Sequence, residues 1–392
     1  MLIAIVVSVI VLLGGYFTNS GASKAATFIS NVDFSRLLIG VLLNFLLFAG
    51  TIQIRIKDLR RQQLPVFLYA TIGVVISAFL IGSMLYWLGP FVGFKFPFTH
   101  WLLFGALISP TDPVSVLNLT RQAEIPPSLE VKIAGESLFN DGVALVLFVS
   151  VLNAIHNPEE GVSFIEIIKV FGIEVLGAIL LGLAIGFIGV RVLYKTSDPK
   201  IHVMFSLAMV MGGQLLAGLL HVSAPLTMVA AGIFFGNYGK KYAINEESER
   251  YLDIFWEVID EILNVILFAL IGFQLLLIDN YQRYWKAAVA AVLVVLLARY
   301  ISILLPSFVV RLQQKMPPRV IFFLTWSGLR GGVSIALALT LTYHLHKDLF
   351  VFITYCVVIF SVLVQGLTLP SLFLEKPSFK EEIEAVDKEL DE

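Results

Sequence analysis

The sequence predicts an all-α polytopic membrane protein with about 12 transmembrane helices. Hydrophobic residues make up 58% of the 392 residues and charged residues only 14%, and the mean hydropathy is +0.88. A soluble domain is typically about a quarter charged. The apolar residues also fall into runs of roughly 20, long enough to cross a hydrocarbon layer as a helix, whereas barrel strands would be about half that length and alternating.

Apolar runs separated by polar residues, Pro or Gly define the expected helices in order along the chain. These are 1–17, 35–54, 64–88, 100–119, 131–155, 164–192, 201–220, 223–237, 254–276, 283–310, 319–343 and 349–373. The first run has neither a basic n-region nor a small-residue cleavage site, so we interpret it as a mature helix and not as a signal peptide. If the N-terminus is cytoplasmic, most basic residues fall in inner loops and in the tail, which predicts that both termini are cytoplasmic.

Composition and motifs exclude several classes of function. The 27 basic and 29 acidic residues give a formal net charge of −2, which offers no electrostatic basis for binding nucleic acid. Cys356 is the single cysteine, which excludes an internal disulfide and a cysteine cluster for metal. The sequence contains no phosphate loop, nucleophile elbow or zinc motif. We therefore expect that the protein is not an enzyme and binds no cofactor. We expect an ion gradient to supply the energy.

Two of the expected helices are interrupted at mid-span. The centre of 100–119 reads ISPTDPVS, where Pro110 and Pro113 each remove an amide donor, and the centre of 319–343 reads SGLRGGVS, where three glycines weaken the helix. Broken backbone at membrane depth persists only where protein or a hydrated cavity satisfies it. One break lies in each half of the chain, which is typical of inverted repeats that place half-helix ends at a midplane site.

A candidate cation site lies next to the first break. Asp112 follows Thr111, whose carbonyl and hydroxyl are freed for coordination by the interrupted helix. In the next span, GESLFNDGVALVL, helical spacing puts Ser137, Asn140 and Asp141 on adjoining strips of one face. Carboxylate, hydroxyl and amide oxygens suit a small hard cation such as Na+. The alternatives are that Asp112 only caps a half-helix and that Asp141 belongs to a structural polar network.

Burial and a neighbouring carboxylate both disfavour the ionised form of a carboxyl group. A proton and a cation then compete for Asp141, with Asp112, Thr111, Ser137 and Asn140 around it. Because a buried charge must be neutralised by one ion or the other before it crosses the membrane barrier, this competition is sufficient for exchange. The sequence therefore favours an antiporter.

Two arginines lie within apolar spans and each needs neutralisation. Arg299 lies in VLVVLLARYISILL, and Glu136 is its natural partner in a structural ion pair that fixes helix contacts. Arg330 lies in the second break, where it either neutralises the dipole ends of interrupted helices or stands beside a cavity.

Five motifs taken together resemble a known family. GALISPTDPVSV, GESLFNDGVALVLF, LLARYISIL, WSGLRGGVSIALAL and VLVQGLTLP are similar, in order and spacing, to cation/proton antiporters of the bacterial NhaP type, relatives of the animal sodium/proton exchangers. The resemblance implies a homodimer of two-domain protomers. A scaffold and dimerisation domain comprises mainly 1–63 and 164–276, and a mobile core domain mainly 64–155 and 283–373. A short acidic tail, 375–392, follows, which we expect to be solvated or to bind a regulator.

The same resemblance implies roles for individual residues. The aspartate matching Asp141 binds the ion or proton, Asp112, the main chain of Thr111 and Ser137 complete the site, and Glu136 pairs with Arg299. Asn140 resembles the electroneutral branch, since electrogenic relatives carry Asp there.

The chain departs from the family pattern in two places. LLFAG places Ala49 where many members carry a Glu in LLFEG, so one carboxylate is missing. Members also usually have thirteen helices, and the first is absent here, which suggests a start upstream of Met1.

The function expected from these observations is exchange of Na+, or Li+, for protons by alternating access in a plasma membrane of bacterial inner-membrane type. The expected partners are these ions, membrane lipid and a second copy of the chain. K+/H+ exchange is the alternative within the class, and a cation channel is the alternative outside it. A membrane sensor has little support because the chain lacks a sizeable soluble output domain.

Overall fold

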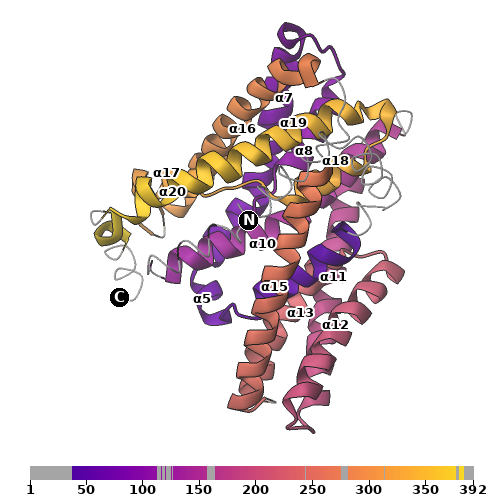
Figure 1. Ribbon diagram of the computed structural model, residues 1–392, viewed down its shortest axis with the longest axis vertical. Helices are drawn as coiled ribbons and strands as arrows, with labels where there is room; N and C mark the ends of the chain where they lie inside the picture. Colours follow the sequence, from indigo (N-terminus) through magenta and orange to yellow (C-terminus); the bar gives the residue numbers. More distant parts are fainter. Residues whose placement is uncertain are drawn as a thin grey trace, which may run out of the picture. The chain divides into compact units, whose positions relative to one another are not determined.

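The computed structural model describes residues 38–112, 116, 120, 125, 127–156, 164–242, 244–274, 281–312, 314–376 and 379–383. Within these ranges all regular secondary structure is helical, which confirms the predicted all-α class (Figure 1). The helix expected at 1–17 lies outside the described residues. Six described helices are long and apolar enough to cross a membrane: Gln63–Val92, Leu129–His156, Gly172–Leu193, Pro199–Leu219, Gln282–Val310 and Lys347–Leu374.

The chain divides into two compact units. Unit 1 comprises Met1–Gln53, Gly172–Arg283 and Ile335–Phe352. Unit 2 comprises Ile54–Phe171, Tyr284–Ser334 and Ile353–Glu392. The assignment of scaffold and transport roles to parts of the chain stays a prediction.

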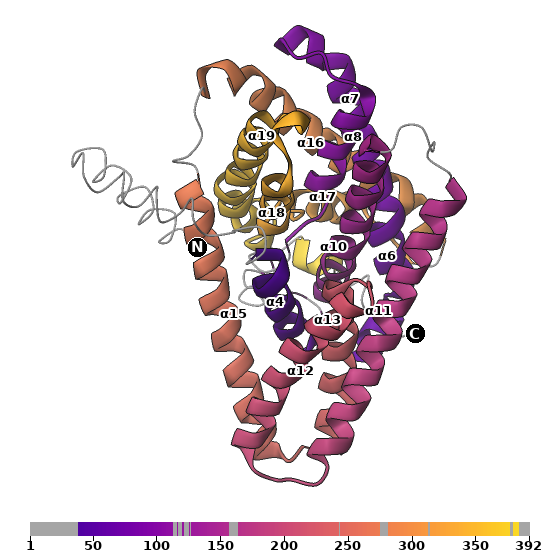
Figure 2. The ribbon, with the colours of Figure 1, turned by 90° about the vertical axis from the view of Figure 1, so that its right-hand side faces the viewer.

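Unit 1 is built from helices around an apolar core that includes the aromatic rings of Phe48, Phe235 and Trp256. Its helices include α4 (Leu43–Thr51), most of α11 (Phe164–Leu193), α12 (Pro199–Leu219), α13 (Ala224–Phe234) and α15 (Glu246–Gln274). The short helix α4 packs against both α13 and α15 (Figure 2). Phe48 of α4 lies against Trp256 of α15, with ring centroids 4.8 Å apart. Ala49 is buried in the same apolar cluster, so this position contributes packing and no charge.

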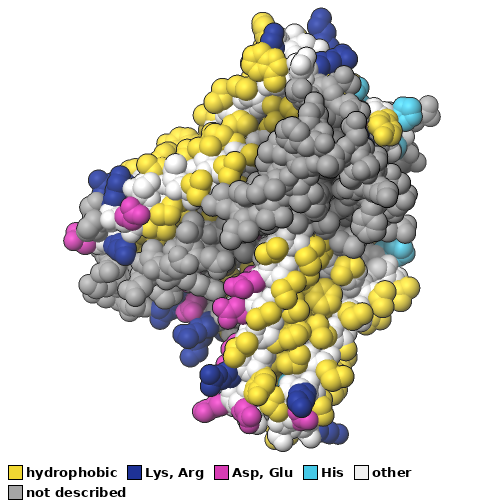
Figure 3. All heavy atoms as spheres, viewed as in Figure 1, with side chains coloured by type: hydrophobic (Ala, Val, Ile, Leu, Met, Phe, Trp, Pro, Cys, Tyr) yellow, Lys and Arg dark blue, Asp and Glu magenta, His cyan; other side chains and the backbone are white. Residues whose placement is uncertain are grey.

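Helix α15 begins at Glu246, earlier than the expected start at 254. The side chain of Asn245 accepts a hydrogen bond from the Ser248 amide at 2.8 Å, which satisfies one of the free donors at the helix start. Acidic residues in the first turn complement the helix dipole. Acidic side chains continue along one flank of α15, beside a surface of exposed hydrophobic side chains (Figure 3).

Unit 2 contains the two interruptions that the sequence predicts. Its helices are α5 (Ile56–Arg61), α6 (Gln63–Leu68), α7 (Val74–Val92), α8 (Phe98–Ile108), α10 (Pro127–His156), α16 (Tyr281–Val310), α17 (Pro318–Trp326), the start of α18 (Gly332–Thr340) and most of α19 (Lys347–Phe360). Helix α8 ends at Ile108, just before Pro110, and α17 is separated from α18 by the glycine-containing segment 327–331. Helix α10 packs against α8, α6 and α5.

The first part of the tail is packed and not fully solvated, which corrects the expectation for that part. Phe379 and Ile383 are buried in the apolar cluster of unit 2, where Phe379 contacts the rings of Phe323 and Phe373 with centroids 5.1 and 5.3 Å away. The acidic composition of the segment obscured these two apolar positions, which are four residues apart and so share one helix face.

Candidate functional site

The first helix interruption presents its backbone to α10. After α8 ends at Ile108, the described residues 109–112 are not helical. The Ser109 hydroxyl donates a hydrogen bond to the Gly105 carbonyl at 2.6 Å, which satisfies one carbonyl near the helix end. Residues 109–112 are thus outside the helical hydrogen-bond pattern, and in this segment Thr111 is buried and Asp112 is half-buried.

Thr111 forms the centre of a buried polar group with α10. Its hydroxyl lies 3.1 Å from the Ser137 hydroxyl and accepts a hydrogen bond from Asn140 Nδ2 at 2.7 Å. Its main-chain amide also faces Asn140 Oδ1, at 3.4 Å. The structure therefore brings together three of the predicted residues, Thr111, Ser137 and Asn140, with both ends of the Asn140 amide engaged.

Asp141 follows this group directly on α10. Its side chain is only 7% exposed and lies within electrostatic reach of Asp112. Among the described residues, no hydrogen bond or ion pair occupies the Asp141 carboxylate. A buried carboxylate is costly unless it is neutralised, and a bound cation or a proton would neutralise this one.

The two interruptions touch each other through main-chain and arginine contacts. The Asp112 amide donates to the Leu329 carbonyl at 2.7 Å. Arg330 Nη1 donates to the carbonyls of Ser109 and Pro110, the latter at 3.2 Å. Because the C-terminal end of a helix carries partial negative charge, Arg330 offsets the dipole of α8 where that helix stops.

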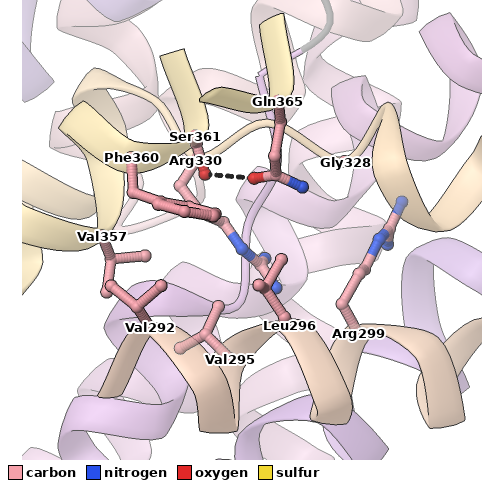
Figure 4. A pocket seen from close by; sticks show the side chains of 10 residues that line it. All are labelled: Val292, Val295, Leu296, Arg299, Gly328, Arg330, Val357, Phe360, Ser361 and Gln365. Carbon is pink, nitrogen blue, oxygen red and sulfur yellow. Dashed lines mark hydrogen bonds between the residues drawn. The ribbon is translucent and has the colours of Figure 1, made fainter. Parts of the chain in front are cut away.

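Arg330 also borders a small pocket, and its role stays a prediction. The pocket is lined by Val292, Val295, Leu296, Arg299, Gly328, Arg330, Val357, Phe360, Ser361 and Gln365 (Figure 4). Nη2 of Arg330 and Nε of Arg299 are buried without a hydrogen-bond partner among the described residues.

Glu136 and Arg299 form a buried ion pair that joins α10 to α16. Both guanidinium Nη atoms bind the carboxylate, one of them at 3.0 Å from Oε2, and the exposed fractions of the residues are 2% and 6%. Arg299 Nη2 also donates to the Leu324 carbonyl of α17 at 3.1 Å. Glu136 immediately precedes Ser137, so this pair fixes the helix turn that carries the polar group.

Two glycines in the second interruption permit these approaches. A Cβ on Gly331 would lie 2.5 Å from Asp112 Cβ and 2.8 Å from Asp112 Oδ2. A Cβ on Gly328 would collide with the Arg299 guanidinium. Gly328 and Gly331 therefore leave room for side chains that approach from α16 and from the first interruption.

Sequence reasoning missed several contributors that act through the backbone or across the interruption. The carbonyls of Leu329, Leu324, Ser109 and Pro110 are acceptors, and such roles leave no residue-type signal in a sequence. Gln365 and Ser361 lie at the pocket wall. The motif VLVQGLTLP contained Gln365, but its spacing alone assigned no role.

The arrangement suits one small monovalent cation. It offers two carboxylates together with neutral hydroxyl and carbonyl oxygens, the ligand type that hard cations prefer. Within the described ranges, no three His, Cys, Asp or Glu side chains gather in a manner that could hold a metal ion.

Comparisons with known proteins identify the family. The family model for the transmembrane sodium/hydrogen exchanger matches residues 1–375. A Na+/H+ antiporter NhaP from Pseudomonas aeruginosa is 44% identical over 350 residues, which cover 88% of this chain and 82% of the relative. A Na+/H+ antiporter NhaH from Halobacillus dabanensis is 32% identical over 342 residues, with 86% and 83% covered.

A solved structure shares the fold. The sodium proton antiporter MjNhaP1 from Methanocaldococcus jannaschii matches with a TM-score of 0.72 and 18% identity, and the alignment covers 95% of this chain and 97% of that one. At 18% identity this match shows the fold alone, and the sequence matches show the family. Because the family model matches residues 1–375 of the 392 residues, this membrane protein belongs to the sodium/hydrogen exchanger family.

Proposed function

We propose that the protein is a secondary transporter that exchanges Na+ for protons across a bacterial cell membrane, with Asp141 binding the two ions alternately. The observation that carries this proposal is the buried Asp141 carboxylate, which lies next to the Thr111–Ser137–Asn140 group and within electrostatic reach of Asp112. Asp112, the main chain of Thr111 and the Ser137 hydroxyl would complete the cation site.

Asp141 supplies the coupling. An ionised carboxylate that leaves water without a partner pays a desolvation penalty, so the empty, charged site does not cross the membrane barrier readily. A bound Na+ or a bound proton each cancels one negative charge. Only the two loaded states cross, and each complete cycle exchanges one ion for the other.

Asn140 supports one-for-one, electroneutral exchange. Its Nδ2 donates to Thr111 Oγ1 at 2.7 Å, a hydrogen bond that an ionised carboxylate at this position could not donate. The position next to Asp141 therefore remains uncharged in both loaded states. If Asp112 stays ionised throughout, the charge of the site is the same whether Asp141 carries Na+ or a proton.

The unit that contains the site has the mobile role in this proposal. All site residues, Asp112, Asp141 and the Glu136–Arg299 pair included, belong to unit 2. We assign transport to unit 2, and to unit 1 the scaffold role with contact to a second copy and to lipid. Exposed apolar side chains on α11 and α12, such as Leu180, Phe187 and Leu215, are suited to a lipid or subunit contact.

Proteoliposome exchange under a clamped membrane potential tests the function. A pH-sensitive dye should report proton movement when Na+ is added, and Asp141→Asn should abolish that signal. The exposed Asp348 supplies a matched control, because Asp348→Asn makes the same chemical change far along the chain. Retained exchange in Asp141→Asn would contradict the assigned role.

The same vesicles separate the alternatives. A response to K+ in place of Na+ would identify K+/H+ exchange, since oxygen ligands constrain charge better than ionic radius. Flux that does not saturate and needs no counter-gradient would identify a channel. A rate that changes with the clamped potential would contradict electroneutrality.

A further inference from the structure

Gln365 and Ser361 form a buried polar pair at the pocket of Figure 4. They lie in a π-helical segment, η6 (Ser361–Gly366), which continues α19. The Ser361 hydroxyl donates to Gln365 Oε1 at 2.7 Å, and Figure 4 shows this contact as a dashed line. Both residues are only 2% exposed. A wider π-turn inside a longer helix is uncommon and is frequently found at functional sites.

The other end of the Gln365 amide reaches the second helix interruption. Nε2 donates to the carbonyl of Trp326 at 3.2 Å. Trp326 is the last residue of α17, where carbonyls have no partner within their own helix. An amide is the group required here, because one end must accept from a hydroxyl and the other must donate to a carbonyl.

A second contact holds the same residue by its side chain. Trp326 Nε1 donates to Thr368 Oγ1 at 3.0 Å, and the Thr368 hydroxyl in turn donates to the Val364 carbonyl at 2.6 Å. The end of α17 is thus attached to the η6 region by both its main chain and its indole ring. These contacts all lie within unit 2.

The segment that begins at this attachment carries the contact to Asp112. Ser327 donates to the Phe323 carbonyl, and Leu329 donates to the Ser327 carbonyl, both at 2.8 Å. The Leu329 carbonyl then accepts from the Asp112 amide at 2.7 Å. A shift of the α17 end therefore moves the acceptor that places Asp112.

We propose that Gln365 is a positioning residue for the cation site and acts through Trp326 and the segment 327–331 on Asp112. Ser361 orients the Gln365 amide for this role. This inference rests on the proposed function for its effect on transport, but its structural part does not depend on transport.

Three variants separate the contacts. Gln365→Met keeps the length of the side chain and removes both hydrogen bonds, whereas Gln365→Glu keeps the shape and sets a carboxylate oxygen against the Trp326 carbonyl. Ser361→Ala removes only the orienting bond, and Ser361→Thr keeps the hydroxyl and serves as its rescue. Gln282→Met is the matched control, since Gln282 is exposed at the start of α16.

Two readouts are measured on the purified full chain in nanodiscs or proteoliposomes. Hydrogen exchange of the amides of 327–331 reports the interruption itself, and the apparent KM for Na+ against the maximal rate reports the site. We expect Gln365→Met and Gln365→Glu to speed exchange of these amides about tenfold or more and to raise the apparent KM about tenfold. Ser361→Ala should give a two- to threefold change in each, with Ser361→Thr and Gln282→Met close to wild type.

The outcomes are distinguishable. Unchanged amide exchange and unchanged KM in folded Gln365→Met would overturn the inference. If Gln365→Met does not fold, Ser361→Ala with wild-type values in both readouts overturns it equally. If the wild-type protein exchanges no cation, the proposed function fails, while faster amide exchange in the variants would still support the structural part.

Discussion

The main-chain amide of Asp112 donates to the carbonyl of Leu329 at 2.7 Å, so the aspartate of one interrupted helix is held by the backbone of the other. Arg330 makes the reciprocal connection, from the second interruption to the carbonyls at the end of α8. In both contacts the acceptor is a main-chain carbonyl. The position of Asp112 is therefore a property of how the two interruptions meet, and small steric changes at their contact should alter cation binding before they alter the fold.

Gly331→Ala tests this dependence. The added methyl group would lie 2.5 Å from Asp112 Cβ and 2.8 Å from its Oδ2, well inside van der Waals contact. Since the Asp112 carboxylate must move to make room, we expect the apparent KM for Na+ to rise by about tenfold or more. Initial rates of Na+-driven proton movement across a range of Na+ concentrations give this value.

Gly212→Ala is the control, because a Cβ at Gly212 on α12 meets nothing within 4 Å. Both variants should purify as folded protein. Equal apparent KM values for the two would show that the approach of Gly331 to Asp112 has no bearing on the site.

The sequence predicts the interruptions well because their cause is local. Pro110 removes an amide donor, and the glycines around Arg330 weaken a helix, whatever surrounds them. The grouping of Ser137 with Asn140 also follows from spacing within one helix. The sequence does not predict which carbonyls receive Arg330 or the Asp112 amide, because those partners are set by the packing of segments more than two hundred residues apart.

Long-range packing also explains the other differences. Phe379 and Ile383 occur in an acidic segment, and only the apolar cluster of unit 2 reveals that they have a surface to cover. Helix α15 begins before its apolar run because Asn245 caps it and because its acidic first turn is favourable at a helix N-terminus. Hydropathy alone located the apolar part of this helix and missed its charged start.

Replacement of Thr111 tests the polar group. Thr111→Val removes the hydroxyl that meets both Ser137 and Asn140, while Thr111→Ser keeps it. Leaving two buried polar side chains without this partner costs roughly 1–3 kcal/mol, so we expect the apparent KM for Na+ to rise about tenfold in Thr111→Val. Thr111→Ser should remain within about threefold of wild type, and a similar loss in both variants would attribute the effect to packing instead of the hydroxyl.

The Glu136–Arg299 pair should show strong coupling in stability. Removing one partner leaves a buried charge unpaired, which typically costs about 3–5 kcal/mol, whereas removing both avoids that penalty. We therefore expect Glu136→Leu and Arg299→Met each to lower the Tm of the purified protein markedly. The double variant should melt at a higher temperature than either single variant. Additive losses would mean that the two side chains do not stabilise the fold as a pair.

The packed start of the tail makes a contrasting prediction. Phe379 is 2% exposed among aromatic rings, so Phe379→Ala should destabilise unit 2 by about 3–5 kcal/mol, measured as a lower midpoint of thermal unfolding. The neighbouring Arg319–Glu382 pair spans 3.7 Å with side chains 62% and 29% exposed. Exposed pairs contribute little, and Glu382→Gln should leave the midpoint nearly unchanged. A larger effect from Glu382→Gln than from Phe379→Ala would contradict the packing role.

Competition at Asp141 predicts how pH changes transport. If Na+ and a proton bind the same carboxylate, protons act as competitive inhibitors of Na+ binding. Where the protonated form dominates, the apparent KM for Na+ should then rise on the order of tenfold for each unit by which pH falls, with the maximal rate unchanged. Rates measured at equal pH on both sides of the vesicle membrane, over several pH values, give both parameters. A falling maximal rate at constant KM would instead mean that the proton acts at a separate group, and Asp141 would lose its place as the shared site.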